Sequence, residues 1–162
     1  MRIADIKYPD VANGKGVRVS LFVQGCNRHC KGCFNEETWD FKGGRQFTDK
    51  DREKIFEYLS YSWVSGLSVL GGEPLEQSEE LKLLLKEVKE KHPNKDIWMW
   101  TGYKYEEVKD RPILKYVDVL VDGAFVEDKK DLDLLFRGSS NQRIINLFKE
   151  RRKIFEKDNS SN

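Results

Sequence analysis

Three cysteines that lie within eight residues are the side chains of this chain best suited to chemistry. Cys26, Cys30 and Cys33 have the spacing C-x3-C-x2-C, and the sequence contains no other cysteine. Four thiolates complete the ligands of a 4Fe-4S cluster and leave it an electron carrier, and a structural zinc ion also takes four protein ligands. With three thiolates, one iron of such a cluster stays open. The cysteines therefore predict an iron-sulfur cluster with one iron that binds a substrate or cofactor.

A zinc site is the alternative for the same loop. His29 would supply a fourth ligand beside the three cysteines. It directly precedes Cys30, which makes it awkward for both side chains to close one tetrahedron. Purification without oxygen distinguishes the two sites, because a zinc protein is colourless whereas a cluster protein is brown and contains iron and sulfide.

Size and charge exclude several classes of protein. A chain of 162 residues is long enough for one domain but too short for an eight-stranded α/β barrel of about 250 residues. With 29 Lys and Arg residues against 28 Asp and Glu residues, the net charge of +1 favours neither nucleic acid nor an acidic membrane as partner. No segment has the apolar run of a secretory signal or of a membrane span. Closely spaced cysteines suit a reducing compartment, so we expect a cytoplasmic protein that binds neither nucleic acid nor membranes.

Alternating apolar residues predict the strands that position the cysteines. Residues 17–23 alternate in this way and run directly into the cysteine loop, which therefore begins at the carboxyl end of a strand. Further strands are expected at 67–70, 96–101 and 116–121, and a fifth at 143–147.

Helical patterns separate these strands. Thr48 and Asp51 have the spacing of a capping arrangement at the start of a helix of about three turns. A second helix carries an apolar stripe over residues 81–88 and ends near 92–94, and a short helical turn is expected at 105–109.

The alternation of strands and helices predicts an α/β fold. We expect a mainly parallel sheet of about five strands with right-handed crossovers, and because five units cannot close, a partial βα barrel. The cysteine loop, the Gly71–Pro74 turn, residues 101–103 and residues 122–123 should converge at the carboxyl ends of the strands. Residues 1–150 form the expected single domain, and residues 151–162 are expected to be a polar, flexible tail.

The cysteine spacing, the strand before it and the Gly-Gly-Glu-Pro turn together resemble the radical S-adenosylmethionine superfamily. Within it, the chain is similar to the family of anaerobic ribonucleoside-triphosphate reductase activating proteins. Matching blocks run in order through roughly residues 11–147, and they comprise residues 19–26, 32–35 with Trp39, 71–75, 100–103, 119–123 and 136–143. The Trp-Thr-Gly-Tyr and Arg-Gly-Ser-Ser-Asn-Gln blocks are the most specific of these.

The resemblance implies a cofactor site. Cys26, Cys30 and Cys33 would hold three irons of one 4Fe-4S cluster, and S-adenosyl-L-methionine would bind the fourth. One electron from the cluster would then break a carbon-sulfur bond of this cofactor.

Five residues would bind S-adenosylmethionine, by the same resemblance. Gly32, Cys33 and Phe34 would line the nucleoside, with Phe34 beside the adenine. Gly72 and Glu73 would meet the methionyl ammonium, for which a carboxylate is a suitable acceptor.

The family's partner is a protein, the anaerobic ribonucleoside-triphosphate reductase, on which it generates a glycyl radical. An electron donor such as flavodoxin would be needed as well. Other members of the superfamily remain alternatives: an activase of the formate-lyase type, or an enzyme of deazapurine synthesis. A zinc-stabilised interaction module is the alternative from a different class.

Two further sets of residues have structural alternatives. Trp98 and Trp100 lie on one face of a predicted strand and are expected to belong to the core or to line the barrel. Asp122 and the Ser139–Gln142 block fit turn and cap chemistry as well as contact with a cofactor or with the reductase.

Overall fold

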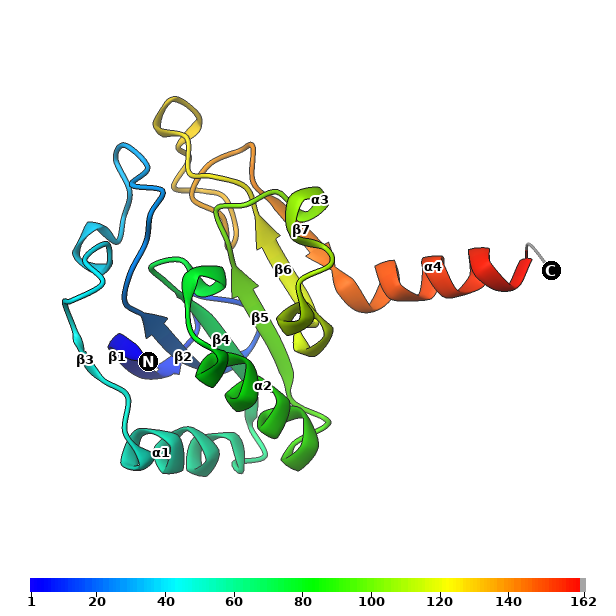
Figure 1. The fold of residues 1–162 in the computed structure, drawn as a ribbon, viewed down its shortest axis with the longest axis horizontal. Coiled ribbons are helices and arrows are strands. Elements are labelled where there is room, and N and C mark those ends of the chain that lie inside the picture. Colours follow the sequence, from blue (N-terminus) through cyan, green and yellow to red (C-terminus); the bar gives the residue numbers. More distant parts are fainter. Residues whose placement is uncertain (161–162) are drawn as a thin grey trace.

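A seven-stranded mixed sheet forms the centre of the molecule, in a computed structural model that describes residues 1–160 (Figure 1). The strand order is β3-β1-β2-β4-β5-β6-β7. The four middle strands β2, β4, β5 and β6 pair in parallel, and β1, β3 and β7 are antiparallel to their neighbours. The strands are β1 (Arg2–Asp10), β2 (Val17–Val23), β3 (Arg45–Gln46), β4 (Val64–Gly71), β5 (Asp96–Trp100), β6 (Val119–Asp122) and β7 (Arg143–Asn146).

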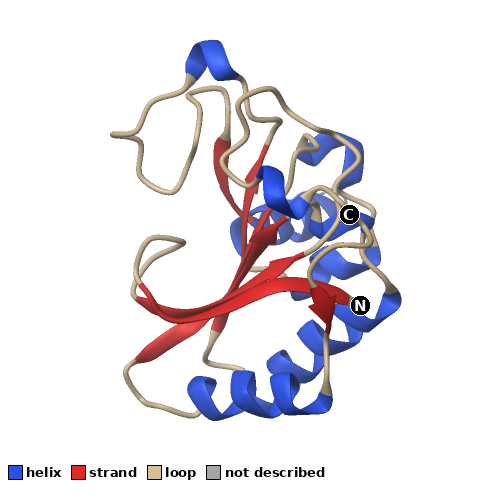
Figure 2. Ribbon diagram, turned by 90° about the vertical axis from the view of Figure 1, so that its left-hand side faces the viewer, coloured by secondary structure: helices blue, strands red, loops and turns tan. Residues whose placement is uncertain are grey.

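The longer helices of the crossovers cover one face of this sheet. α1 and α2 lie on the same side, and no helix of the described residues packs along the middle of the opposite face (Figure 2). The α-helices are α1 (Asp49–Leu59), α2 (Glu79–Lys91), α3 (Tyr105–Val108) and α4 (Leu147–Ser160). Short 3-10 helices are η1 (Glu36–Thr38), η2 (Pro74–Glu76), η3 (Pro112–Tyr116) and η4 (Glu127–Lys129).

The sheet confirms the α/β class and the parallel centre, but the predicted number of strands is wrong. β1 and β3 were not expected, because the charged residues Asp5, Lys7 and Asp10 interrupt the apolar residues of β1, and β3 has only two residues. β1 pairs along β2, and this tertiary contact makes it a strand. The predicted strand at 116–121 starts later, at Val119, because η3 precedes it. Closure of the sheet into part of a barrel stays a prediction.

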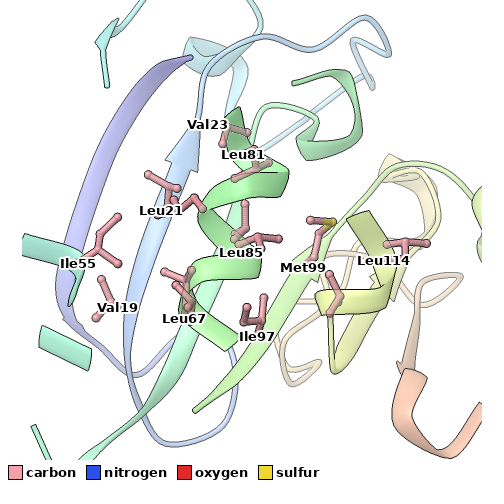
Figure 3. Packing of buried hydrophobic residues seen from close by; sticks show 14 of the residues in the cluster. Val19, Leu21, Val23, Ile55, Leu67, Leu81, Leu85, Ile97, Met99 and Leu114 are labelled. Carbon is pink, nitrogen blue, oxygen red and sulfur yellow. The ribbon is translucent and has the colours of Figure 1, made fainter. Parts of the chain in front are cut away.

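Alternate residues of the strands build the core on the helix side. The predicted stripe of α2 is entirely buried there and packs over β2, β4 and β5 (Figure 3). Its residues are Leu81, Leu84, Leu85 and Val88, and the strands contribute Val19, Leu21, Val23, Leu67, Val69, Ile97 and Met99. The intervening residues therefore point to the helix-free face, which we call the open face. Polar and aromatic side chains of the open face include Arg18, Ser20, Phe22, Ser68, Trp98 and Trp100.

The start of α1 has the predicted capping arrangement. Thr48 Oγ1 accepts a hydrogen bond from the Asp51 amide, and the Asp51 carboxylate accepts one from the Thr48 amide. Arg45 of β3 donates two further hydrogen bonds to this carboxylate, at 2.6 and 2.9 Å. Together these contacts lower the pKa of Asp51 from 3.8 to about 2, and the hydrogen bonds from Arg45 are the largest cause.

The C-terminal segment is helical for longer than expected. α4 continues to Ser160 and projects away from the sheet (Figure 1). Flexibility of the tail stays a prediction, and residues 161–162 lie outside the described residues. No helix among residues 1–160 combines the length and the apolar composition needed to cross a membrane.

Replacing Arg45 with Met should lower the free energy of unfolding by about 1 kcal/mol near neutral pH, since the Arg45 side chain is half exposed and solvent screens the ion pair. An aspartate whose pKa is lowered by folding contributes stability above its unfolded pKa and loses that contribution as it protonates. The difference between the two proteins should therefore shrink as the pH falls from about 4 to about 2. Urea unfolding across this range measures it, and a constant difference would contradict the assignment.

Candidate active site

The chain segments that follow β2 and β4 contact each other directly where the two strands end. Val23 pairs with Gly71 in the parallel ladder, and beyond this pair the Gly72 amide donates to the Val23 carbonyl at 2.9 Å. The Glu73 amide donates to the Gly25 carbonyl at 2.8 Å. A Cβ atom on Gly72 would lie 2.3 Å from the Gly25 carbonyl oxygen, so only glycine fits there. The cysteine loop and the Gly-Gly-Glu turn therefore start from the same place. We call this contact of Gly72 and Glu73 with Val23 and Gly25 the joint.

A cavity of about 510 Å³ opens over this joint. The structure brings all four predicted segments to it, through Cys26, Cys30 and Cys33, Gly71 to Glu73, Thr101 with Gly102, and Gly123. Tyr103, Pro74 and Asp122, which belong to the same predicted segments, do not line it. Of the other predicted residues, Phe34 lines the cavity and remains 49% exposed, whereas Gly32 does not line it, and a Cβ atom there would lie 3.0 Å from the Glu127 side chain.

The cysteine loop provides a donor set that fits an iron-sulfur cluster. All three thiols are free and partly buried on one loop. Burial raises the pKa of the Cys26 thiol, and backbone N–H groups of Arg28 and His29 act in the opposite direction. The Asn35 amide donates a hydrogen bond of 3.4 Å to Cys33 Sγ, and hydrogen bonds to sulfur are among the groups that set a cluster's potential.

The zinc alternative requires His29 as a ligand beside the three cysteines. Within residues 1–160, no three His, Cys, Asp or Glu side chains surround a point that could hold a single ion. The His29 ring instead stacks on Trp39, with centroids 4.5 Å apart. Thiolates of a cluster bind different iron atoms and need not meet at one point. His29, the fourth ligand that the zinc alternative needs, thus has Trp39 as its partner.

Glu73 holds the wall of the cavity together. The residue is 2% exposed, and burial raises the pKa of its carboxyl group. Its Oε1 accepts from the Gly102 amide at 2.6 Å, and its Oε2 accepts from Thr101 Oγ1 at 2.9 Å and from the Leu75 amide at 3.1 Å. This one carboxylate therefore links the turn after β4 to the turn after β5.

Arg28 is a cavity residue that sequence reasoning missed. Its guanidinium lies over the Tyr103 ring at 4.8 Å, and its Cδ atom would be 2.4 Å from a Cβ on Gly102. The Arg28 side chain therefore occupies the space that a side chain at position 102 would need. Because Arg28 lies between Cys26 and Cys30 in the sequence, its proximity to the site could have been predicted. Its contact with Tyr103, a residue far away in the sequence, could not be predicted from residue spacing.

The segment between β6 and β7 closes the cavity on the side away from β2. We call residues 123–142 the rim loop. Besides Gly123, it lines the cavity with Phe125, Leu134, Phe136, Arg137, Gly138 and Gln142, of which only Gln142 belongs to the block whose role the sequence left open. Phe125 meets Phe34 of the cysteine loop at 5.1 Å between centroids, so two loops far apart in sequence lie side by side (Figure 1).

The undecided polar residues have structural partners. Asp122 is buried and accepts two hydrogen bonds from Arg143, at 3.0 and 2.5 Å, and one from the Tyr105 amide at 2.7 Å. Gln142 accepts from the Gly138 and Ser139 amides and donates to the Gly123 carbonyl. Both therefore stabilise turns, and Gln142 also reaches the cavity wall. Trp98 is buried on the open face, whereas Trp100 lines the cavity.

The fold and the cysteine site define an iron-sulfur protein. Residues 12–145 match the family described as a 4Fe-4S single cluster domain. The protein is 46% identical over 140 residues to the anaerobic ribonucleoside-triphosphate reductase-activating protein of Enterobacteria phage T4, covering 85% of this chain and 89% of the relative. Proteins of the same name are 44% identical over 149 residues in Haemophilus influenzae and 40% identical over 147 residues in Escherichia coli K12, covering 88% and 86% of this chain and 96% of each relative.

The chain therefore belongs to the family of anaerobic ribonucleoside-triphosphate reductase-activating proteins, as its sequence motifs predicted.

Replacing Glu73 with Gln should lower the free energy of unfolding by about 2 kcal/mol. The amide nitrogen of glutamine would face either the Gly102 or the Leu75 N–H, and one buried donor would lose its acceptor. Urea denaturation measures the change. The same substitution at Glu79, which is exposed at the start of α2, is the control and should change stability by less than about 0.5 kcal/mol. Equal effects at both positions would contradict the linking role of Glu73.

Proposed function

We propose that this protein activates an anaerobic ribonucleoside-triphosphate reductase by reductive cleavage of S-adenosylmethionine, which generates a glycyl radical on the reductase. The observation that carries the proposal is that three cysteines of one loop and the Gly-Gly-Glu turn line the same cavity. The names of relatives at 40% to 46% identity support the choice of protein partner over the formate-lyase and deazapurine alternatives.

In this proposal Cys26, Cys30 and Cys33 each hold one iron of a 4Fe-4S cluster. A bound and reduced cluster would supply the one electron that breaks a carbon-sulfur bond of S-adenosylmethionine and releases methionine, and the remaining nucleoside fragment would take the hydrogen atom from the glycine. The electron comes from a low-potential donor such as flavodoxin. The partial burial of the cysteines and the Asn35 amide on Cys33 Sγ would both affect the reduction potential of a cluster bound there.

The remaining wall of the cavity would bind S-adenosylmethionine. Glu73 already accepts three hydrogen bonds, so it offers the methionyl ammonium a negative charge and little further acceptor capacity. Carbonyl groups near Gly72 supply the other acceptors. Cys33 and Phe34 of the cavity wall, with Gly32 from the same loop, would line the nucleoside, and the neighbouring Phe125 ring would help to keep water away from it.

Replacing Cys26, Cys30 or Cys33 with Ala should each abolish S-adenosylmethionine cleavage and glycyl radical formation, because two thiolates leave a second iron without a protein ligand. Each protein is reconstituted without oxygen, its iron and sulfide are measured, and the radical is recorded as an EPR doublet on the cognate reductase. His29→Ala is the matched control from the same loop. It should retain the cluster and the radical, whereas a zinc site would lose a ligand.

Two results would reject the proposal. One is wild-type protein that, with a full cluster and a strong reductant, fails to cleave S-adenosylmethionine. The other is cleavage that never produces a glycyl radical on the reductase, which would favour another substrate. Circular dichroism of each variant shows whether loss of activity reflects loss of the fold.

A further inference from the structure

The tip of the rim loop exposes two leucines beside the cavity. Leu132 is 79% exposed, the highest value among the large hydrophobic residues that the structure describes as exposed, and Leu135 is 67% exposed. Neither lines the cavity, whereas their neighbour Leu134 does. One short segment thus turns one leucine inward and two leucines outward.

The base of the rim loop is firmly attached to the rest of the molecule. Phe136 packs edge-on against Trp98 at 5.2 Å, and its carbonyl accepts a hydrogen bond of 2.8 Å from Trp100 Nε1. The Ser139 side chain is fully buried, and residues Lys130 and Ser139 form an isolated β-bridge across the loop. The exposed tip is therefore held at a defined place by its flanking residues.

Phe136 also adopts an unusual backbone conformation. Its φ angle is +63°, in the left-handed region that bulky side chains rarely occupy. The hydrogen bond from Trp100 and the contact with Trp98 hold Phe136 in place, and Leu135, the residue before it, is exposed.

The charge of the rim loop limits the class of partner. Residues 123–142 contain four carboxylates (Glu127, Asp128, Asp131 and Asp133) against three cations (Lys129, Lys130 and Arg137), a net charge of −1. Such a loop does not favour the phosphates of nucleic acid or an acidic membrane. Exposed leucines flanked by charges are instead typical of a protein contact, with an apolar centre and a polar rim.

We propose that Leu132 and Leu135 are the docking contact for the protein substrate, whose glycine-bearing segment enters the adjacent cavity. This inference rests on the proposed function and adds the surface that recognises the partner. Because the tip is continuous with the cavity wall through Leu134, a polypeptide that reaches the cysteine loop passes directly beside it. The partner is expected to present an apolar depression, which accepts both leucines, close to its reacting glycine.

The double variant Leu132→Ser/Leu135→Ser tests the docking contact. It leaves Leu134 and every other cavity residue in place, and both replaced side chains are exposed, so the fold should be retained. Affinity of the reconstituted holoprotein for the cognate reductase is measured by sedimentation or thermophoresis. S-adenosylmethionine cleavage by the same samples is measured with dithionite and without reductase.

We expect the double variant to bind the reductase about 10- to 100-fold more weakly, with cleavage in the absence of reductase unchanged within about twofold. Leu83→Ser is the matched control, because Leu83 is an exposed leucine on α2, on the helix side of the sheet. It should leave both measurements unchanged.

Wild-type affinity in the double variant would overturn the docking contact. An equal loss of cleavage without reductase would also overturn it, since the tip would then be maintaining the cavity. A wild-type protein that cannot cleave S-adenosylmethionine at all would instead reject the proposed function. These failures are therefore distinguishable.

Discussion

The contact between Gly72 and Gly25 is the constraint on which the rest of the site depends. It exists because β2 and β4 are parallel neighbours that end together, at the pair Val23 and Gly71. The amide of Glu73 closes the joint on the Gly25 carbonyl, and a side chain at position 72 would collide with that carbonyl. The loop that carries the cysteines and the turn that carries Glu73 are thereby held as one unit.

The uneven covering of the sheet explains why a cavity forms above this joint. α1 and α2 bury the apolar residues of one face, whereas the open face carries buried polar and aromatic groups. Arg18 is fully buried there, paired with Asp96 at 2.7 Å, hydrogen-bonded to Ser68 and 5.6 Å from the Trp98 ring centroid. A buried cation is tolerated only with such partners. The buried groups around Arg18 hold Trp98 and its neighbour Trp100 in place, and the rim loop packs against these two tryptophans through Phe136.

Local pattern predicted those elements whose periodicity was clear. The stripe of α2, the cap at Thr48 and the strand leading into Cys26 follow from residue spacing, and all three were found. β1 was missed because its pairing with β2 makes it a strand, and its own residues do not show this. The convergence of four segments was predictable because parallel strands end at one edge, but the cavity residues Arg28 and Phe125 were not.

By itself, the sequence determined the chemistry that is available. It places three thiols on one short loop, and it places the Glu73 carboxylate directly after the pair of glycines at 71 and 72, which permit close approach of another backbone. Tertiary structure alone decided which distant residues meet. Glu73 joins Thr101 and Gly102, Arg28 lies on Tyr103, and Phe136 is held by Trp98 and Trp100. Spacing along the chain reports only neighbours within a turn or strand, whereas these contacts depend on strand order and on how the crossovers pack.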